Sequence, residues 1–578
     1  NNDSDNDDKT PCESPCRDKS CIRCPDFRRF TKATDLELFY DLFFVANLTV
    51  FTYVHEINDC NTLEQYVGFF SILWFTWYQV SMYDVRFAMD SVLERVFKAV
   101  QFLVMMGFAI CASDFRVGEQ ATSDNEDEVA NAMIYLRALT IVLFISRMVL
   151  MIQYLQTLWF ARHFHRARTA LAVIAGVYFV AGFVYLGMYW TLHLDSNGRN
   201  HTYIIWYVFS LTETIAVTAT SCYWRNISFD GTHLVERMSL LTLIILGEGA
   251  IATAKACLYI VYAEDAFSFT GSVAAVVFCA VLNLYFLYMI YFDWIHEETF
   301  GTIRQQIWSV LHFPLHAALV LAVEGASQCI TWTAATVRKK QLVNGVLDIS
   351  DVLLASNGSV MATWNQAAAD LSEEADSLLT IKLRRSDELS STVAALGYYH
   401  QVNASVIPTI LNGTANPEAG GNAIWWITGV LYNAIYEIGG FYAPESPEVT
   451  QQSIDYLTEP LDFSAYPLNY WRDNAEENIS KSFNVFTLTF VYFFIATGVF
   501  VIMCAVLAML NRGRHTQYFW TRLAPMVFLG LALALMSTMI VADQTIRHFL
   551  QGPWILPTIT FTLFAIVVLN SVKLPSPK

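Results

Sequence analysis

Long apolar segments recur along almost the whole chain and predict membrane-spanning helices. Each has about 18 residues or more, close to the number that an α-helix rising 1.5 Å per residue needs to cross about 30 Å of hydrocarbon. The fourth and ninth segments are longer than a bilayer requires, so we expect them to tilt or to extend into water. The predicted fold class is an all-α integral membrane protein with about twelve spans, at 36–54, 65–83, 96–113, 131–160, 169–190, 203–221, 234–256, 270–294, 304–331, 484–510, 522–542 and 553–572.

The stretch between the ninth and tenth spans interrupts this pattern. It contains helix-compatible segments at 365–385 and 424–442 and is too long for a structureless linker. We predict an external insertion that either covers a pore mouth or forms a glycosylated decoration. The chain then divides into a cytoplasmic Cys-bearing tail (1–34), nine spans (35–331), the insertion (332–483), three spans (484–572) and a cytoplasmic tail (573–578).

Composition agrees with a membrane protein. Hydrophobic residues make up 55% of the chain and charged residues only 15%, against roughly 25% charged in soluble proteins. The net charge is −17, which argues against nucleic acid as a partner. The expected partners are the lipid bilayer and a small ion or small-molecule substrate, and the pattern is compatible with a homo-oligomer.

Basic residues beside short loops set the expected orientation. They alternate with acidic loops and are Arg28, Arg29, Lys32, Arg95, Lys98, Arg162, Arg166, Arg168, Arg512, Arg514 and Arg522. Because such residues stay on the cytoplasmic side, we expect both termini to be cytoplasmic. Five glycosylation sequons fall on the opposite side and predict glycans: Asn200, Asn357, Asn403, Asn412 and Asn478. Such glycans suggest a eukaryotic secretory-pathway membrane, with the plasma membrane as the first expectation.

Ionisable residues lie inside or at the ends of several spans. Glu37 and Asp41 are four apart and share one helix face, so each needs a partner or a proton if it is buried. In the seventh span Arg237 and Glu248 are three turns apart on nearly one face. The flanking residues Gly247 and Gly249 would let another helix approach Glu248 closely. We expect Glu248 and Asp41 to face the protein interior and to meet arginine partners, with Arg86 and Arg237 as the candidates and Arg147 as the alternative.

The ordered motifs carry a family resemblance. They read LELFYDLFFV at 36–45, YDVRF at 83–87, HLVER at 233–237, LGEG at 246–249, YFD at 291–293 and LHFPL at 311–315. This set resembles the low temperature requirement A family, whose hallmark is an ELFFDLVFV-like opening followed by RF, HLxERF…LGE and YFD elements. The resemblance covers 34–330 well and 484–572 weakly, and the insertion departs from it. It implies a multi-pass helical membrane protein without implying a molecular activity.

The first three spans also resemble the seventh to ninth. Glu37 corresponds to Glu236, and Tyr83-Asp84 corresponds to Phe292-Asp293. An offset of six spans preserves orientation. We therefore predict two parallel six-helix halves related by a rotation of about 180° around the membrane normal.

A histidine pair in the ninth span leaves three readings open. His312 and His316 are four apart, with Glu324 two turns deeper. The group could bind a metal, could contact a proton or substrate, or could consist of ordinary buried histidines.

No cofactor is predicted for the chain as a whole. Zinc at Cys12, Cys16, Cys21 and Cys24 is one reading of their spacing, beside S-acylation and plain thiols. Pairing among other cysteines is left open, the candidates being Cys60, Cys111, Cys257 and Cys329.

Two arginines in the fourth span, Arg137 and Arg147, lack the spacing of a voltage sensor. We expect them to neutralise the buried carboxylates Asp41, Glu213 or Glu248.

Charged residues at membrane depth usually mark an ion or proton pathway. The leading hypothesis is a transporter or an ion or proton channel, and an enzyme is the less favoured reading. Its pathway residues would be Glu37, Asp41, Arg86, Glu236, Arg237, Glu248, Asp293, His312, His316 and Glu324. Two alternatives are a metal-dependent intramembrane enzyme acting on lipid, and a sensory or structural protein whose external segment binds a partner. The chain lacks Gly-x-Ser-x-Gly and His-Glu-x-x-His motifs, which disfavours the enzyme.

Overall fold

The computed structural model is almost entirely helical over the residues that it describes, and these residues contain no strand. They are 32–87, 91–119, 126–193, 200–224, 232–262, 270–295, 302–355, 470–511, 517–541, 543–571 and scattered positions between 422 and 441. The helices are α1 (Asp35–Val54), α2 (Cys60–Phe87), α3 (Val92–Ala112), α4 (Glu126–Phe160), α5 (His165–Thr191), α6 (Ile204–Tyr223), α7 (Leu234–Tyr262), α8 (Gly271–Phe292), α9 (Thr302–Val310), α10 (His312–Ala355), α16 (Tyr470–Asn511), α17 (Gln517–Met536), α18 (Asp543–Leu550) and α19 (Ile555–Ser571), with a 3₁₀ turn at Ser537–Val541.

Within these described ranges, ten helical segments are long and apolar enough to cross a membrane. Two further helices, α2 and α19, coincide with the remaining predicted spans. Helix α2 is less apolar than these ten segments and is buried over nearly its whole length, so it forms part of the protein interior. The prediction of an all-α integral membrane protein is confirmed.

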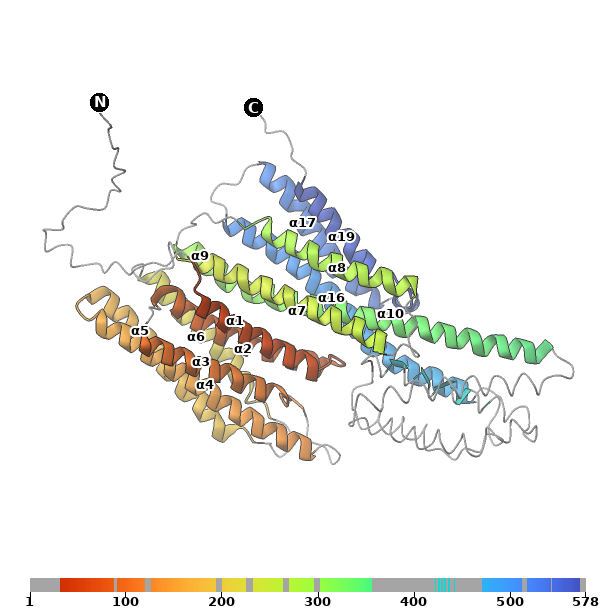
Figure 1. The fold of residues 1–578 in the computed structure, drawn as a ribbon, viewed down its shortest axis with the longest axis horizontal. Coiled ribbons are helices and arrows are strands. Elements are labelled where there is room, and N and C mark those ends of the chain that lie inside the picture. Colours follow the sequence, from red (N-terminus) through yellow and green to blue (C-terminus); the bar gives the residue numbers. More distant parts are fainter. Residues whose placement is uncertain are drawn as a thin grey trace, which may run out of the picture.

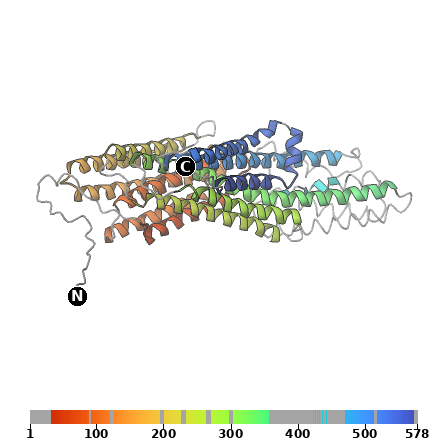
Figure 2. The ribbon, with the colours of Figure 1, turned by 90° about the horizontal axis from the view of Figure 1, so that it is seen from above.

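The helices form two six-membered rings with the same neighbour order (Figures 1 and 2). In the first ring, neighbours in contact are α1, α2, α6, α5, α4 and α3, closing on α1. In the second they are α7, α8, α19, α17, α16 and α10, closing on α7. Each member of the second ring lies six spans after its counterpart in the first. This shared order supports the predicted repeat, and the rotation that relates the halves stays a prediction.

The main interface between the two rings is formed by the first helices of each. Helix α1 packs against α7, and α2 packs against both α7 and α10. Figure 1 shows the start of α1 and the end of α19 at the same end of the bundle. We call this the proximal end, and the opposite end the distal end.

Helices α10 and α16 extend well beyond the others at the distal end (Figure 2). Helix α10 runs on to Ala355 and α16 already begins at Tyr470. Both therefore continue into the segment that was expected to be a separate insertion from 332 to 483. Helix α10 starts after a break at Leu311, which places Pro314 in its first turn, where the missing N–H breaks no helical hydrogen bond.

The predictions on glycosylation and disulfides fall partly within the described residues. Asn200 is 7% exposed, and its Nδ2 donates to the carbonyls of Thr191 at 3.4 Å and His193 at 2.5 Å, so an attached glycan would replace one of two N–H donors that are in use. Asn478 lies in the helical range of α16, and Asn357, Asn403 and Asn412 lie outside the described residues. The thiols of Cys60, Cys111, Cys257 and Cys329 are all unpaired with one another.

One of the two glycines beside Glu248 holds helices close together. A Cβ on Gly249 would lie 2.6 Å from Val323 of α10 and 2.8 Å from Leu284 of α8. The expectation that both glycines allow another helix to approach is therefore confirmed for Gly249 and wrong for Gly247. Gly247 is exposed, and a methyl group added to it would meet no atom within 4 Å.

This difference gives a matched pair of variants. Gly249→Ala is expected to destabilise the protein by about 1–3 kcal/mol through overpacking. Gly247→Ala is expected to be neutral or slightly stabilising, because alanine is the better helix former by about 0.8–1.0 kcal/mol. Thermal unfolding midpoints of the two purified variants in detergent measure the difference. Equal midpoints would show that α7 does not depend on this contact.

Candidate functional site

An ion pair between α1 and α7 lies at the proximal end of the interface. The guanidinium of Arg237 donates to both oxygens of Asp41, at 2.6 and 2.8 Å. Trp77 of α2 donates its indole N–H to the same carboxylate at 2.8 Å, and Arg237 also reaches the hydroxyl of Ser81 at 3.2 Å. Both charged side chains are fully buried. The expected arginine partner of Asp41 is therefore Arg237, held in a bidentate geometry.

Glu37 has two functions one turn before Asp41. It completes a capping box with Thr34, which satisfies backbone N–H groups at the start of α1. Its Oε2 also lies 2.9 Å from His233 Nε2 and 3.9 Å from Arg237 Nε. The Glu37, Asp41, His233 and Arg237 side chains form what we call the proximal ion cluster.

Three more charged residues at this end belong to the first ring. Lys98 is buried against the carboxylate of Asp84 and lies 4.7 Å from the Tyr40 ring. Arg86 donates to the hydroxyls of Ser221 and Tyr154, both at 2.7 Å. The structure thus places Arg86 inside the first ring and gives it partners other than Asp41 or Glu248.

The two predicted histidines lie at mid-depth and are fully buried. Trp74 donates to His316 Nδ1 at 3.0 Å, so this nitrogen accepts, and Nε2 carries the proton that it donates to Thr242 at 2.8 Å. His312 Nδ1 donates to the Trp308 carbonyl at 2.8 Å.

The second nitrogen of His312 lies 2.9 Å from the Tyr291 hydroxyl. Both nitrogens of each ring are therefore engaged by the protein. Glu324 lies eight residues beyond His316, and the described residues hold no group of three His, Cys, Asp or Glu side chains arranged for a metal. The geometry favours the reading of ordinary buried histidines. The cysteines proposed for zinc lie outside the described residues.

Glu248 lies on the distal side of this histidine layer and is 5% exposed. Thr49 of α1 donates to its Oε2 at 2.5 Å, and its Oε1 has no hydrogen-bond partner within the described part of the chain. The expectation that Glu248 faces the interior is met. The expected arginine is not there, because Arg237 is bound to Asp41 three turns away.

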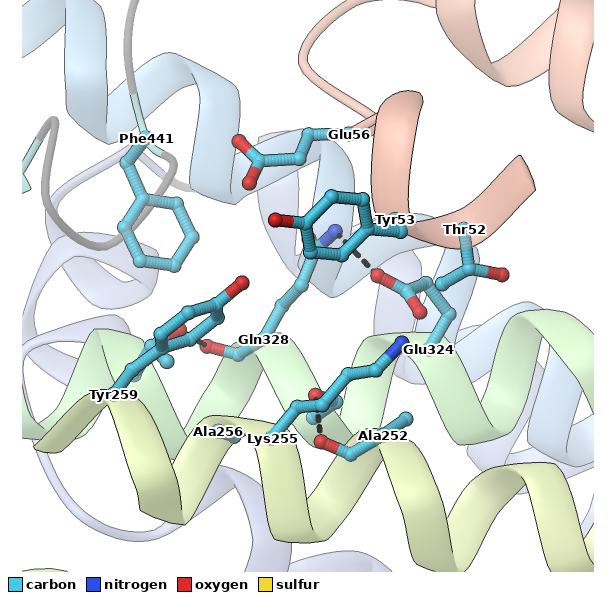
Figure 3. Close-up of a pocket in the computed structure, with 12 residues that line it drawn as sticks. Thr52, Tyr53, Glu56, Ala252, Lys255, Ala256, Tyr259, Glu324, Gln328 and Phe441 are labelled. Carbon is cyan, nitrogen blue, oxygen red and sulfur yellow. Dashed lines mark hydrogen bonds between the residues drawn. The ribbon is translucent and has the colours of Figure 1, made fainter. Parts of the chain in front are cut away.

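A pocket opens beyond Glu248 at the distal end of the interface (Figure 3). Its volume is about 70 Å³, and it lies between the ends of α1 and α7 and the middle of α10. Three charged side chains line it, Glu56, Lys255 and Glu324. The lining also includes Ala252, so the pocket ends about one helical turn from Glu248. The remaining lining residues are Thr52, Tyr53, Ala256, Tyr259, Ser327, Gln328, Thr331 and Phe441. We call this the distal pocket.

An amide fixes the carboxylate of Glu324 in the distal pocket. The hydroxyls of Thr489 and Tyr492 on α16 donate to Gln328 Oε1 at 2.8 and 3.1 Å. This leaves Gln328 Nε2 to donate to Glu324 Oε1 at 3.1 Å. Glu324 itself is only 9% exposed. The orientation of Glu324 therefore depends on contact between α10 and α16.

Polar side chains follow α7 from one end of the interface to the other. They are His233, Arg237, Thr242, Glu248 and Lys255. The 22 residues of α7 from Leu234 to Lys255 span about 33 Å, which is about the thickness of a bilayer core. Helix α1 contacts His233, Arg237, Glu248 and Lys255, and His316 of α10 contacts Thr242. We call this array the polar column.

Two predicted pathway residues lie away from the polar column. Glu236 is exposed and accepts a hydrogen bond from the Ala33 backbone N–H at 3.1 Å. Asp293 follows the end of α8, where partial burial raises the pKa of its carboxyl and the nearby charge of Arg522 opposes that rise. The structure does not bring these two together with the other candidates.

The first ring contains a second buried ion pair. Arg147 Nε lies 2.8 Å from Glu213 Oε1, and both side chains are essentially inaccessible. Arg147 also donates to Thr76 at 3.3 Å. The expectation that Arg147 neutralises a buried carboxylate is confirmed for Glu213. Arg137 instead donates to the Leu192 carbonyl at 2.7 Å.

Several residues of the site were absent from the predicted set. Thr49, Lys255 and Gln328 are single polar residues within helices, and Glu56 follows the end of α1, so none of them belongs to a recognisable motif. The spacing of Lys255 two turns after Glu248 was a usable signal, because residues seven apart on a helix share a face.

Comparison with known proteins agrees with this architecture and with the motifs that build the site. No curated protein and no solved structure matches the chain. A family model described as bacterial low temperature requirement A protein (LtrA) matches residues 32–412. The matched range includes every motif of the proximal ion cluster and the distal pocket residues up to Thr331, and it ends before α16. The chain belongs to the low temperature requirement A family of multi-pass membrane proteins.

Proposed function

We propose that the protein is a transporter that moves protons or a small cation along the polar column between its two halves. The observation that carries this proposal is a cavity at the distal end of a buried, charge-bearing interface whose described proximal residues form a closed ion pair. The distal pocket is open to a ligand, whereas Asp41 and Arg237 fill the proximal end with a bidentate ion pair. A static channel would need a continuous path, so this arrangement favours alternating access over an open pore.

The orientation of the proposal follows from the loop charges. If the proximal end is cytoplasmic, the distal pocket faces outside, and the structure represents an outward-facing state. Movement of α7 and α10 relative to α1 and α2 would then expose Glu248 to the other side. Glu248 is suited to this role because hydroxyl contact with Thr49 is weaker than an ion pair and leaves its charge able to change.

A lipid-acting metal enzyme has less support. Its proposed histidines, His312 and His316, have both ring nitrogens engaged by tryptophan, threonine, tyrosine and backbone groups. A partner-binding role of the insertion concerns residues outside the described part of the chain.

Flux measurements in liposomes test the proposal. Purified protein is reconstituted with a pH-sensitive dye inside, and proton movement is followed after a pH step. Glu248→Gln is expected to fold normally and to reduce flux to the level of empty liposomes, because an amide cannot titrate. Asp114→Asn, which alters a partly exposed carboxylate paired with Arg116, is the control and should keep wild-type flux.

The Gln and Ala variants separate transport from helix packing. If Glu248 only joins helices, Glu248→Gln keeps both the hydrogen bond and the flux, while Glu248→Ala lowers the unfolding midpoint. Wild-type pH-dependent flux in a well-folded Glu248→Gln protein would remove this carboxylate from the mechanism. The charged groups that act on Glu324 at the pocket, Glu56, Lys255 and Glu248, should be varied in parallel.

A further inference from the structure

The distal pocket contains a cation of its own. The Lys255 ammonium lies 5.6 Å from the centre of the Tyr53 ring, over its face. Figure 3 shows this side chain extended along the pocket with its nitrogen directed toward Glu324. Lys255 also acts electrostatically on both Glu324 and Glu248. The pocket therefore already holds one ammonium group between an aromatic face and carboxylates.

The charge balance leaves room for a second cation. Glu324 in the pocket and Glu248 about one turn deeper both act electrostatically on the single ammonium of Lys255, so these carboxylates outnumber it by one. An anion would meet net negative charge. A monovalent cation would bring the pocket close to neutrality, which is the usual condition for charges at low dielectric.

The walls distinguish between kinds of cation. Three aromatic rings line the pocket, those of Tyr53, Tyr259 and Phe441. Ring faces attract weakly hydrated organic ammonium ions, which is how proteins recognise quaternary amines. A volume of about 70 Å³ exceeds the roughly 10–15 Å³ that one water needs, so it accommodates a small group of several heavy atoms.

Resting on the proposed function, we infer that the distal pocket binds a small organic ammonium ion and that Lys255 acts as a tethered competitor for its position. In the ligand-free pocket the lysine ammonium neutralises part of the carboxylate charge. An arriving ammonium ion displaces it from the aromatic and acidic surroundings. The lysine thereby sets the affinity at a level that permits release.

Binding can be measured without any gradient. Purified full-length protein in detergent is titrated with tetramethylammonium chloride, with sodium chloride keeping the ionic strength constant, and the unfolding midpoint is followed. The wild type should show a saturable rise, because a ligand that binds only the folded state stabilises it. Sodium chloride alone should give no saturable rise.

Variants of Lys255 test the competitor. Lys255→Gln and Lys255→Met should each lower the apparent Kd for tetramethylammonium by about tenfold, since a like charge has left the pocket. Lys255→Arg should stay near the wild type. Lys340→Gln removes the same charge from an exposed position of α10 and should change nothing. Glu324→Gln should raise the Kd by about tenfold.

Two results would overturn the inference. Absence of a saturable shift in the wild type and in both neutral Lys255 variants would exclude an organic ammonium ligand. A Kd that is unchanged or higher in both neutral variants would exclude the competitor role. Saturable binding by a protein that shows no flux would instead retire the proposed transport function and leave this inference standing.

Discussion

Asp41→Asn is expected to lower the free energy of unfolding by about 3–5 kcal/mol. The carboxylate of Asp41 is fully buried and pairs with both terminal nitrogens of Arg237. Removing its charge leaves the buried guanidinium with only the more distant carboxylate of Glu37, 3.9 Å from Nε, and the desolvation of the guanidinium is what makes the loss large. The indole N–H of Trp77 would then donate to a neutral amide oxygen in place of an ionised carboxylate.

Unfolding in mixed micelles of increasing SDS content measures this loss. Glu236→Gln is the matched control, because Glu236 precedes Arg237 on the same helix and is exposed. It should change the free energy of unfolding by no more than about 0.5 kcal/mol. The double variant Asp41→Leu with Arg237→Met should recover most of the stability, since apolar groups of similar volume need no partner. A loss below about 1 kcal/mol in Asp41→Asn would show that water reaches the pair.

Arg147→Met should destabilise the protein by a similar amount, about 3–5 kcal/mol. Its guanidinium is the counter-charge of Glu213 inside the first ring, and both side chains are excluded from solvent. Thr76 accepts a hydrogen bond from Arg147, and Tyr185 donates one to Glu213. Neither side chain carries a charge that could replace the guanidinium. The same SDS titration measures the effect.

The corresponding double variant also carries functional information. Arg147→Met with Glu213→Leu should regain most of the lost stability and keep pH-dependent flux, because the pair lies away from the α1, α7 and α10 interface. Arg116→Gln alters a partly exposed ion pair and should lower the free energy of unfolding by less than about 1 kcal/mol. Loss of flux in a stable double variant would extend the pathway into the first ring.

The sequence predicted the membrane-spanning helices and included Arg237 among the candidate partners of Asp41. Apolar length alone predicts where helices cross a membrane, and all twelve predicted segments are helical. A buried carboxylate demands a positive partner, and Arg237 was one of the arginines predicted to meet Asp41 or Glu248; the structure selects it for Asp41. The neighbour order of the rings also agrees with the repeat seen between Glu37 and Glu236.

The partners of the deeper groups could not be predicted in the same way. Which side chain meets Glu248 depends on the rotation of α1 about its own axis, and that rotation brings Thr49 rather than arginine to it. The extent of α10 was also missed, because its continuation past 331 is too polar to look like a span and needs contact with α16 to be recognised as helix. The histidine contacts depend on tryptophan and tyrosine from other helices.

The amide of Gln328 links the distal pocket to the contact between α10 and α16. It is held by Thr489 and Tyr492 of α16 while it holds Glu324 of α10. The residues between 355 and 470 are covalently attached to the ends of these same two helices. A movement that separates the two helices would therefore withdraw the amide donor from Glu324 and raise the electrostatic cost of its charge, so the state of this carboxylate depends on the distance between α10 and α16.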